Sequence, residues 1–325
     1  MKEIAFVHDT AGCRRPQVLL LGNGPERTTG QAAWDALLEK LRAPGVRSLT
    51  ETEKNTIPFP LQYQLLSTPS PAPCTLSEEE ILQEEHRLRD GVRELCNSSN
   101  ALLDRLPALG LDHIMTTNYT YSLEAAFFPK RNYLKCGVRN TTRFNLSRPD
   151  KDGVQRCERE YRLHSGYLAR NADGSPVGLW HVHGEISVPR GIVVGHDRYG
   201  RLLSRMETVC AREAPHPKNA EPYSFCSWPV LFLYADVYVL GFGFELCEYD
   251  LWWLLRRKQR ERYADGKVYF YDNGKSDKAM IRRSLLEAHG VRINPGGICP
   301  EASYEAFYEK AIDAIARQIR ENRRS

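Results

Sequence analysis

Two side chains in this sequence could act chemically on a bound ligand, because each follows an apolar run typical of a buried strand. His183 lies in Leu-Trp-His-Val-His-Gly-Glu-Ile (residues 179–186), and Asn118 ends Ile-Met-Thr-Thr-Asn (residues 114–118). An imidazole with a pKa of about 6.5 exchanges a proton at neutral pH. A carboxamide holds a water molecule or a ribose hydroxyl without adding charge. The structural alternatives are a histidine bonded to a backbone carbonyl, and an asparagine that caps a helix expected over residues 119–127.

Two glycine turns also follow apolar runs. Gly22-Asn23-Gly24 comes after residues 18–21, and Gly241-Phe242-Gly243 comes after residues 236–240. A strand, a glycine turn and a helix in this order direct backbone N–H groups toward an anion such as a pyrophosphate. The alternatives are a plain tight turn and close packing of a helix on the sheet. A further carboxylate, Asp272, ends an expected strand and could bond ribose hydroxyls, or could simply form an Asp-Asn-Gly turn.

The spacing of His181, His183 and Glu185 also allows a metal-binding pair with a carboxylate. His196 and Asp197 could complete such a site, but Gly184 interrupts the strand and no other histidine cluster accompanies the pair. We therefore expect no metal. The sequence does not decide whether His181 or His183 faces a ligand.

Alternating strands and helices are expected over most of the chain, and they predict an α/β fold with a mainly parallel sheet covered by helices on both faces. In such sheets, ligands bind beyond the carboxyl ends of the strands. The expected strands cover residues 18–21, 112–117, 179–183, 191–194, 236–240, 267–271 and 291–294. The expected helices cover residues 32–41, 119–127, 199–211, 246–262, 276–289 and 303–320.

We expect a single domain over residues 1–325, with insertions at about 48–110 and 134–178. Residues 48–73 are rich in Pro, Thr and Ser and predict a loop. Ser77 and Glu80 form a capping box that opens a helix. Residues 134–178 are polar and predict an insertion with short strands.

The composition is that of an ordinary globular protein, with 42% apolar and 26% charged residues in 325 positions. The net charge of +4 is too small to predict direct nucleic-acid binding. With no secretory leader and no membrane-spanning run, we expect a cytoplasmic protein without a membrane partner. The nine cysteines are scattered singly without a CxxC, which predicts reduced thiols and no zinc framework.

Together and in this order, the motifs resemble the SIR2-like superfamily, and its bacterial NAD-hydrolase branch more than its protein deacylases. Gly22-Asn23-Gly24 with Trp34 and the following Leu37-Leu38 resembles the first glycine loop and its helix. Thr116-Thr117-Asn118-Tyr119, His183-Gly184-Glu185 and the late Gly241-Phe242-Gly243-Phe244 with Asp250 resemble the other three signatures. The likeness spans residues 17 to 275 and implies a Rossmann-like fold.

The resemblance implies that His183 is a catalytic base and that Asn118 positions NAD⁺ and water. It implies NAD⁺ contacts from Gly22, Asn23, Gly24, Thr117, Gly241, Phe242, Gly243 and Asp272. The implied enzyme is an NAD⁺ nucleosidase that cleaves the nicotinamide–ribose bond of NAD⁺, which is a substrate here. The missing cysteine module departs from the deacylases, and Thr120 stands where an Asp often follows Asn-Tyr.

The resemblance also implies an anti-phage defence effector that depletes NAD⁺. Such an enzyme must be held inactive, so we expect a homo-oligomer and a separate activator or sensor, for which a HerA-type ATPase or an Argonaute-like protein would fit. The helical residues 252–255 (Trp-Trp-Leu-Leu) cannot all face one core, which also favours a second chain or an insertion against them. Two alternatives remain: an NAD-dependent protein deacylase and a non-catalytic NAD-binding regulatory protein.

Overall fold

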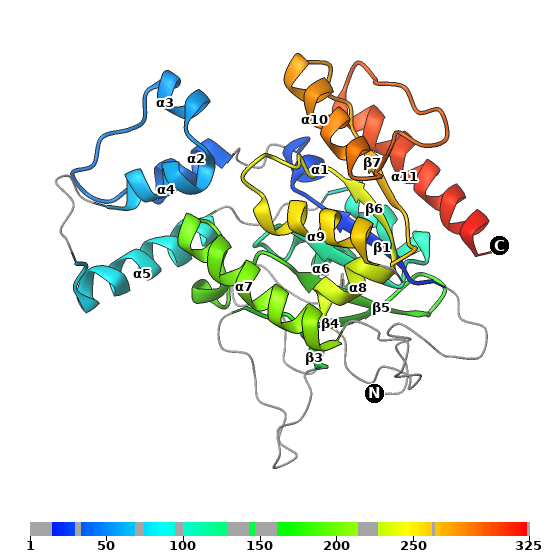
Figure 1. Ribbon diagram of the computed structural model, residues 1–325, viewed down its shortest axis with the longest axis horizontal. Helices are drawn as coiled ribbons and strands as arrows, with labels where there is room; N and C mark the ends of the chain where they lie inside the picture. The colour runs from blue at the N-terminus through cyan, green and yellow to red at the C-terminus, as the bar shows by residue number, and fades with distance from the viewer. Residues whose placement is uncertain are drawn as a thin grey trace, which may run out of the picture.

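The computed structural model describes residues 15–29, 34–68, 75–94, 100–128, 143–146, 161–213, 227–261 and 264–323. Its centre is one sheet of eight strands (Figure 1). In chain order they are β1 (Gln17–Leu21), β2 (His113–Thr116), β3 (Arg143–Asn145), β4 (Ser165–Arg170), β5 (Pro176–His181), β6 (Asp236–Leu240), β7 (Val268–Tyr271) and β8 (Arg292–Ile293).

The order of the strands across the sheet is β3-β4-β5-β2-β1-β6-β7-β8. The six strands from β5 to β8 run parallel, and β3 and β4 extend the β5 edge in antiparallel fashion. Counted in chain order, the six parallel strands lie as 3-2-1-4-5-6, the order of a doubly wound, Rossmann-like sheet. The order reverses between β1 and β6, so this junction is where such a sheet opens a crevice for a ligand.

Helices cover both faces of the sheet, which confirms the expected layers. One face packs against α6 (Ser122–Phe127), α11 (Tyr304–Asn322) and the 3₁₀ helix η1 (Leu103–Leu109). The other packs against α7 (His196–Glu213), α8 (Trp228–Tyr234), α9 (Tyr249–Arg260) and α10 (Asp277–Ala288). Among the described helices, none is long and apolar enough to cross a bilayer.

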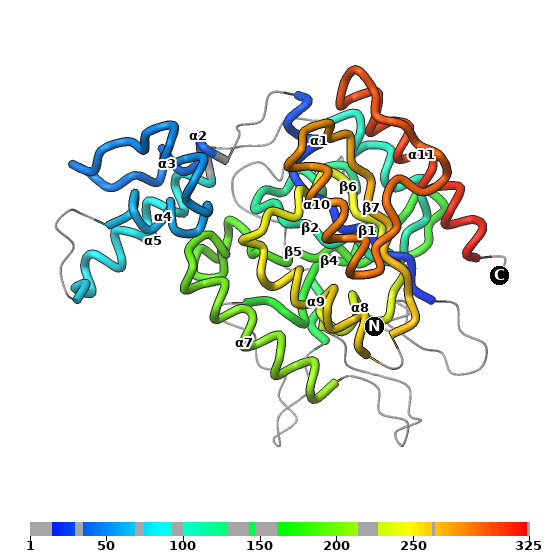
Figure 2. Tube along the Cα trace, turned by 45° about the horizontal axis from the view of Figure 1, so that its top comes forward, coloured from blue at the N-terminus to red at the C-terminus, as the bar shows by residue number. Residues whose placement is uncertain are grey.

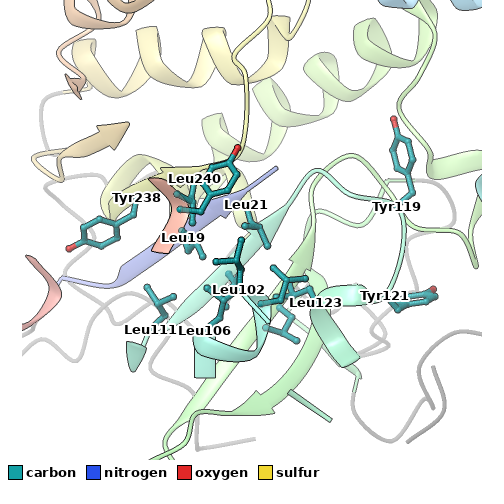
Figure 3. Packing of buried hydrophobic residues seen from close by; sticks show 14 of the residues in the cluster. Leu19, Leu21, Leu102, Leu106, Leu111, Tyr119, Tyr121, Leu123, Tyr238 and Leu240 are labelled. Carbon is teal, nitrogen blue, oxygen red and sulfur yellow. The ribbon is translucent and has the colours of Figure 1, made fainter. Parts of the chain in front are cut away.

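The central strand β1 shows why the sheet is buried on both sides. Leu19 and Leu21 enter the core against η1 and α11, and Figure 3 shows them beside Leu106 and Tyr238. Val18 and Leu20 enter the opposite core. Successive side chains of a strand point to opposite faces, so a strand covered on both faces reads as a continuous apolar run.

The first expected insertion is a helical lobe. Its helices α3 (Glu51–Thr56), α4 (Phe59–Ser67) and α5 (Glu78–Glu94) join α2 (Trp34–Lys40), which precedes the insertion, and the four lie together at one side of the molecule in both views (Figures 1 and 2). The loop predicted over residues 48–73 is therefore wrong over α3 and α4. Thr50 forms a capping box with Glu53, and Pro60 occupies the first turn of α4, where proline starts a helix and does not break it.

Three other expectations change. The described part of residues 134–178 contributes β3, β4 and the start of β5, so these short strands join the main sheet. No strand forms over residues 191–194: a 3₁₀ turn, η3 (Pro189–Gly191), and an irregular segment take its place. The helix expected over residues 119–127 begins only at Ser122. Irregular backbone in these two places brings residues 119 and 193 into contact, through a hydrogen bond from Tyr119 Oη to the carbonyl of Val193.

The turns after β1 and β6 are bonded to each other by their backbones. Gly22 N donates to the Leu240 carbonyl at 3.0 Å, and Gly24 N donates to the Gly241 carbonyl at 2.9 Å. A Cβ atom on Gly22, Gly24 or Gly241 would lie closer than 3.0 Å to the opposite turn, and Gly241 also has a positive φ of 67°. Glycine is required here because two backbones touch.

We expect Gly22→Ala and Gly241→Ala each to lower the free energy of unfolding by about 2 kcal/mol, since the added methyl group forces the two turns apart. Gly243→Ala is the matched control, because a Cβ there meets only ordinary contacts beginning at 3.6 Å. Chemical denaturation of the three variants measures the difference. Equal stabilities would show that the paired turns do not hold the junction.

Candidate active site

The turns at the carboxyl ends of five parallel strands surround one cavity of about 770 Å³. Its wall includes every residue expected to act in catalysis or to contact NAD⁺, except Gly22, which lies in the paired turns. These lining residues are Asn23, Gly24, Thr117, Asn118, His183, Gly241, Phe242, Gly243 and Asp272. Tyr308 of helix α11 and Phe59 of the helical lobe line other sides of the cavity. The cavity thus lies over the β1–β6 junction.

The paired turns change the expected role of the first glycine loop. Its two glycine N–H groups are already used by the carbonyls of Leu240 and Gly241, so they do not point to a ligand. Arg27 lies one turn further on, lines the cavity, and makes no ion pair within the described part of the chain. This guanidinium is the group on this side that can meet a phosphate.

His183 is the histidine that faces the cavity. It follows β5 by two residues and is 3% exposed. Its carbonyl accepts from Val193 N at 2.8 Å, and the next residue, Gly184, has a φ of 90° that turns the chain away from the strand direction. Tyr199 of α7 contacts the imidazole edge to face, with ring centroids 5.6 Å apart. The ring is therefore held on three sides.

Asp250 is the main partner of His183. The histidine Nε2 lies 2.9 Å from Asp250 Oδ2, and the aspartate is fully buried in the first turn of α9. Burial alone lowers the pKa of His183, but the charge and hydrogen bond of Asp250, assisted by Glu248, outweigh it and raise the pKa above the usual value. With Nε2–H donating to Asp250, Nδ1 is the nitrogen left to accept a proton.

The sequence analysis named Asp250 only as part of the late glycine motif and assigned it no contact with His183, and it did not single out Glu248. Glu248 lines the same cavity, accepts a hydrogen bond from Tyr199 Oη at 2.7 Å, and lies 3.8 Å from His183 Nε2. Burial raises the pKa of Glu248 to about 7. The sequence feature that could have identified Glu248 is the pair of acidic residues just after a glycine turn, at the start of a helix that begins at the sheet edge.

Asn118 is held from two directions. Its Nδ2 donates to Glu26 Oε1 at 2.7 Å, and its carbonyl accepts from His181 Nδ1 at 2.8 Å. This arrangement excludes the expected helix cap, because α6 begins after Tyr121 and has no side-chain cap. Because Glu26 takes the amide N–H, the side-chain oxygen of Asn118 is left to accept hydrogen bonds in the cavity.

His181 and Glu185 do not join His183 in one site. His181 Nε2 bonds Glu124 Oε1 at 2.9 Å, and Glu124 is fully buried on α6. Burial by itself lowers the pKa of His181, but the Glu124 carboxylate raises it to about 9. Glu185 is buried among hydrogen-bond donors supplied by Tyr121, Arg143, Arg162 and Tyr167. The alternation of the three residues does not continue along one strand, because β5 ends at His181.

Asp272 forms the Asp-Asn-Gly turn and lines the cavity as well. Its Oδ1 accepts from Gly274 N at 3.0 Å, and its Oδ2 accepts from Arg283 Nε at 2.9 Å. Asn273 bonds the backbone of Glu301 on both its side-chain atoms. The carboxylate is thus positioned by structural hydrogen bonds at the end of the cavity near β7.

The described residues contain one group of metal-ligand type, made by His183, Glu248 and Asp250, whose ligand atoms all lie within 4.8 Å of one another. In the structure these atoms bond each other and Tyr199. Of the polar atoms of these three side chains, only Asp250 Oδ1 is buried without a hydrogen-bond partner among the described residues. His196 and Asp197 are exposed at the start of α7 and do not join the group.

No protein-family model matches this sequence, and no curated protein matches it significantly. The likeness to the SIR2-like superfamily rests therefore on the short motifs named above. What the geometry adds is that these motifs, which are far apart in the chain, line one cavity.

We expect Asp250→Asn to lower the pKa of His183, because the amide keeps a hydrogen-bond acceptor at the imidazole but removes the charge that offsets burial. An NMR titration of histidine-labelled protein measures this shift, with the His183 signal assigned from its loss in His183→Ala. Glu207→Gln, at an exposed glutamate on α7, is the control that leaves the titration in place. An unchanged His183 pKa in Asp250→Asn would contradict the assigned pairing.

We also predict that the protein binds no stoichiometric metal, since hydrogen bonds within the chain already use His183 Nε2 and Glu248. Elemental analysis of the purified protein, before and after chelation, measures it. One tightly held ion per chain, lost together with activity on chelation, would instead assign these residues and Asp250 Oδ1 to a metal centre.

Proposed function

We propose that this protein is an NAD⁺ glycohydrolase with a SIR2-like fold, an enzyme that releases nicotinamide and ADP-ribose. One observation carries the proposal. Asn118 and His183, delivered by the neighbouring strands β2 and β5, line one cavity with the paired turns of β1 and β6, at the reversal point of a 3-2-1-4-5-6 sheet. Dinucleotides bind at this point in doubly wound sheets.

The size and charge of the cavity suit a dinucleotide. Its volume of about 770 Å³ falls within the range of about 300–1,000 Å³ usual for ligand sites. Arg27 offers a cation beside the first turn, where a pyrophosphate would lie. Asp272 lies at the end near β7, where a ribose could reach its carboxylate. His183 and Asn118 then meet the nicotinamide half.

The reaction breaks the bond between ribose C1′ and the pyridinium nitrogen, and the electron pair of that bond leaves with neutral nicotinamide. The ribose becomes oxocarbenium-like, and a water molecule adds to C1′ and loses a proton. His183 Nδ1 accepts that proton, and Asp250 stabilises the imidazolium that forms. The Asn118 oxygen, directed by Glu26, holds the water or a ribose hydroxyl in place.

Two other functions remain alternatives to the proposal. A protein deacylase would use NAD⁺ with an acylated lysine, but the sequence lacks the CxxC pairs of the zinc module common in deacylases of this superfamily. A non-catalytic regulatory protein would bind NAD⁺ and leave it intact. The second alternative gives no role to the charged partner that His183 has in Asp250.

The wider role in this proposal comes from the resemblance alone: a cytoplasmic, NAD-depleting defence effector, homo-oligomeric, and switched by a separate activator such as a HerA-type ATPase or an Argonaute-like protein. The tryptophans that favoured a second chain are accounted for within one chain. Trp252 packs against Phe244 and His289, and Trp253 lies beneath Arg257. The proposal of a homo-oligomer therefore rests on the need to hold the enzyme inactive.

We expect the protein, alone or with a candidate activator added, to convert NAD⁺ to nicotinamide and ADP-ribose. We expect His183→Ala and Asn118→Ala to lower kcat by about 100-fold or more under the same conditions, because they remove the proton acceptor and the positioning amide. Chromatography of the products measures turnover. His196→Ala, at the exposed start of α7, is the matched histidine control. Full turnover in His183→Ala would refute the mechanism, and binding without cleavage by the wild type would favour the regulatory alternative.

A further inference from the structure

We propose that Glu248 is a further catalytic residue, which binds a hydroxyl group of the ribose whose C1′–N bond breaks and, as a carboxylate, stabilises the positive charge that develops on that ribose. This inference rests on the proposed NAD⁺ glycohydrolase activity and deepens it, because it adds an ionisable group that the sequence motifs did not include.

The first argument is position. Glu248 and Asp250 are both close to His183, but only Glu248 lines the cavity. The Glu248 side chain is 16% exposed, whereas that of Asp250 is fully buried and bonds the imidazole. Of the two acids, Glu248 is the one that a ligand can touch. It also lies at the end of the cavity where His183 would meet the scissile ribose.

The second argument is the free hydrogen-bonding capacity of this carboxyl group. Tyr199 Oη donates to Oε2 at 2.7 Å and fixes that oxygen. Among the described residues, none forms a hydrogen bond with Oε1 of Glu248, so this oxygen can accept one from a ligand hydroxyl. A carboxylate is an acceptor only, which suits a ribose hydroxyl and excludes a phosphate.

The third argument is electrostatic. Burial raises the pKa of Glu248 to about 7, His183 lowers it and Asp250 raises it, so the group changes charge near neutral pH. Two neighbouring carboxyl groups in a buried site, here Asp250 and Glu248, do not both ionise easily. A cationic substrate favours the ionised form of Glu248. The titratable groups facing Glu248 are His183 after β5, Asp250 on α9, Tyr199 on α7, Tyr119 after β2, and Glu245 and Cys247 on its own loop.

In the proposed reaction, C1′ loses the pyridinium nitrogen with the bonding electron pair and becomes cationic. The Glu248 carboxylate then lies beside a positively charged ribose, and its hydrogen bond to the hydroxyl strengthens as that charge grows. Carboxylates stabilise oxocarbenium-like transition states of glycosides in this way. Water adds at C1′ and its proton goes to His183 Nδ1, so Glu248 forms no covalent bond and keeps its charge throughout.

The test compares full-length wild type, Glu248→Gln and the control Glu207→Gln. Steady-state NAD⁺ cleavage gives kcat and KM, calorimetry gives NAD⁺ binding, and thermal unfolding gives Tm. We expect Glu248→Gln to bind NAD⁺ within about threefold of wild type and to lose about 100-fold in kcat, because the lost stabilisation acts only in the transition state. The part of the rise of kcat through about pH 7 that Glu248 causes should also disappear, which leaves the part set by His183. Glu207→Gln should match the wild type.

A second variant keeps the proposal testable if Glu248→Gln does not fold. Tyr199→Phe removes the hydroxyl whose hydrogen bond lowers the pKa of Glu248, so the rise of kcat should move to higher pH with Glu248 still present. A wild type that cleaves NAD⁺, combined with full kcat in Glu248→Gln or an unmoved profile in Tyr199→Phe, overturns the role of Glu248 and leaves the glycohydrolase intact. A wild type that does not cleave NAD⁺, either alone or with the candidate activators, overturns both.

Discussion

The backbone contact between the turns after β1 and β6 is the constraint on which the site depends. Hydrogen bonds from Gly22 and Gly24 to the facing carbonyls extend the pairing of the two strands past their ends. That contact uses N–H groups that a phosphate-binding loop would offer to its ligand. It also fixes the floor of the cavity, so that α1 (Gly24–Arg27) places Glu26 beside Asn118 and Arg27 at the cavity wall.

Two buried pairs, each of a histidine and an acidic residue, lie beside the cavity. Asp250 holds Nε2 of His183, and Glu124 holds Nε2 of His181, whose other nitrogen bonds the Asn118 carbonyl. The first pair leaves a nitrogen facing the cavity, whereas the second uses both ring nitrogens inside the protein. A histidine with both nitrogens bonded is a structural support, and one with a free nitrogen can exchange protons with a ligand. The two histidines, two residues apart, therefore have different roles.

The charge arrangement around His183 is unusual for a structural histidine. Asp250 and Glu248 place two carboxyl groups near one imidazole, and the cavity is open to Glu248. Glu245, further along the wall, is paired with Lys278 and Arg282. A site of this charge favours a cationic ligand group over an anionic one. Arg27 provides the opposite charge beside the first turn. This separation of charge along one cavity matches a ligand that is cationic at one end and carries phosphates further along, which is the charge pattern of NAD⁺.

The sequence alone determined the alternation of strands and helices, because strands buried on both faces form continuous apolar runs, as β1 and β6 do after their first residues. It also located His183 and Asn118 at strand ends. Only the tertiary structure decided that His183, and not His181, faces the cavity, since the end of β5 and the φ of Gly184 set that direction. The partners Asp250 and Glu26 come from 67 and 92 positions away. Local patterns cannot reveal such pairs, because the sheet order brings them together.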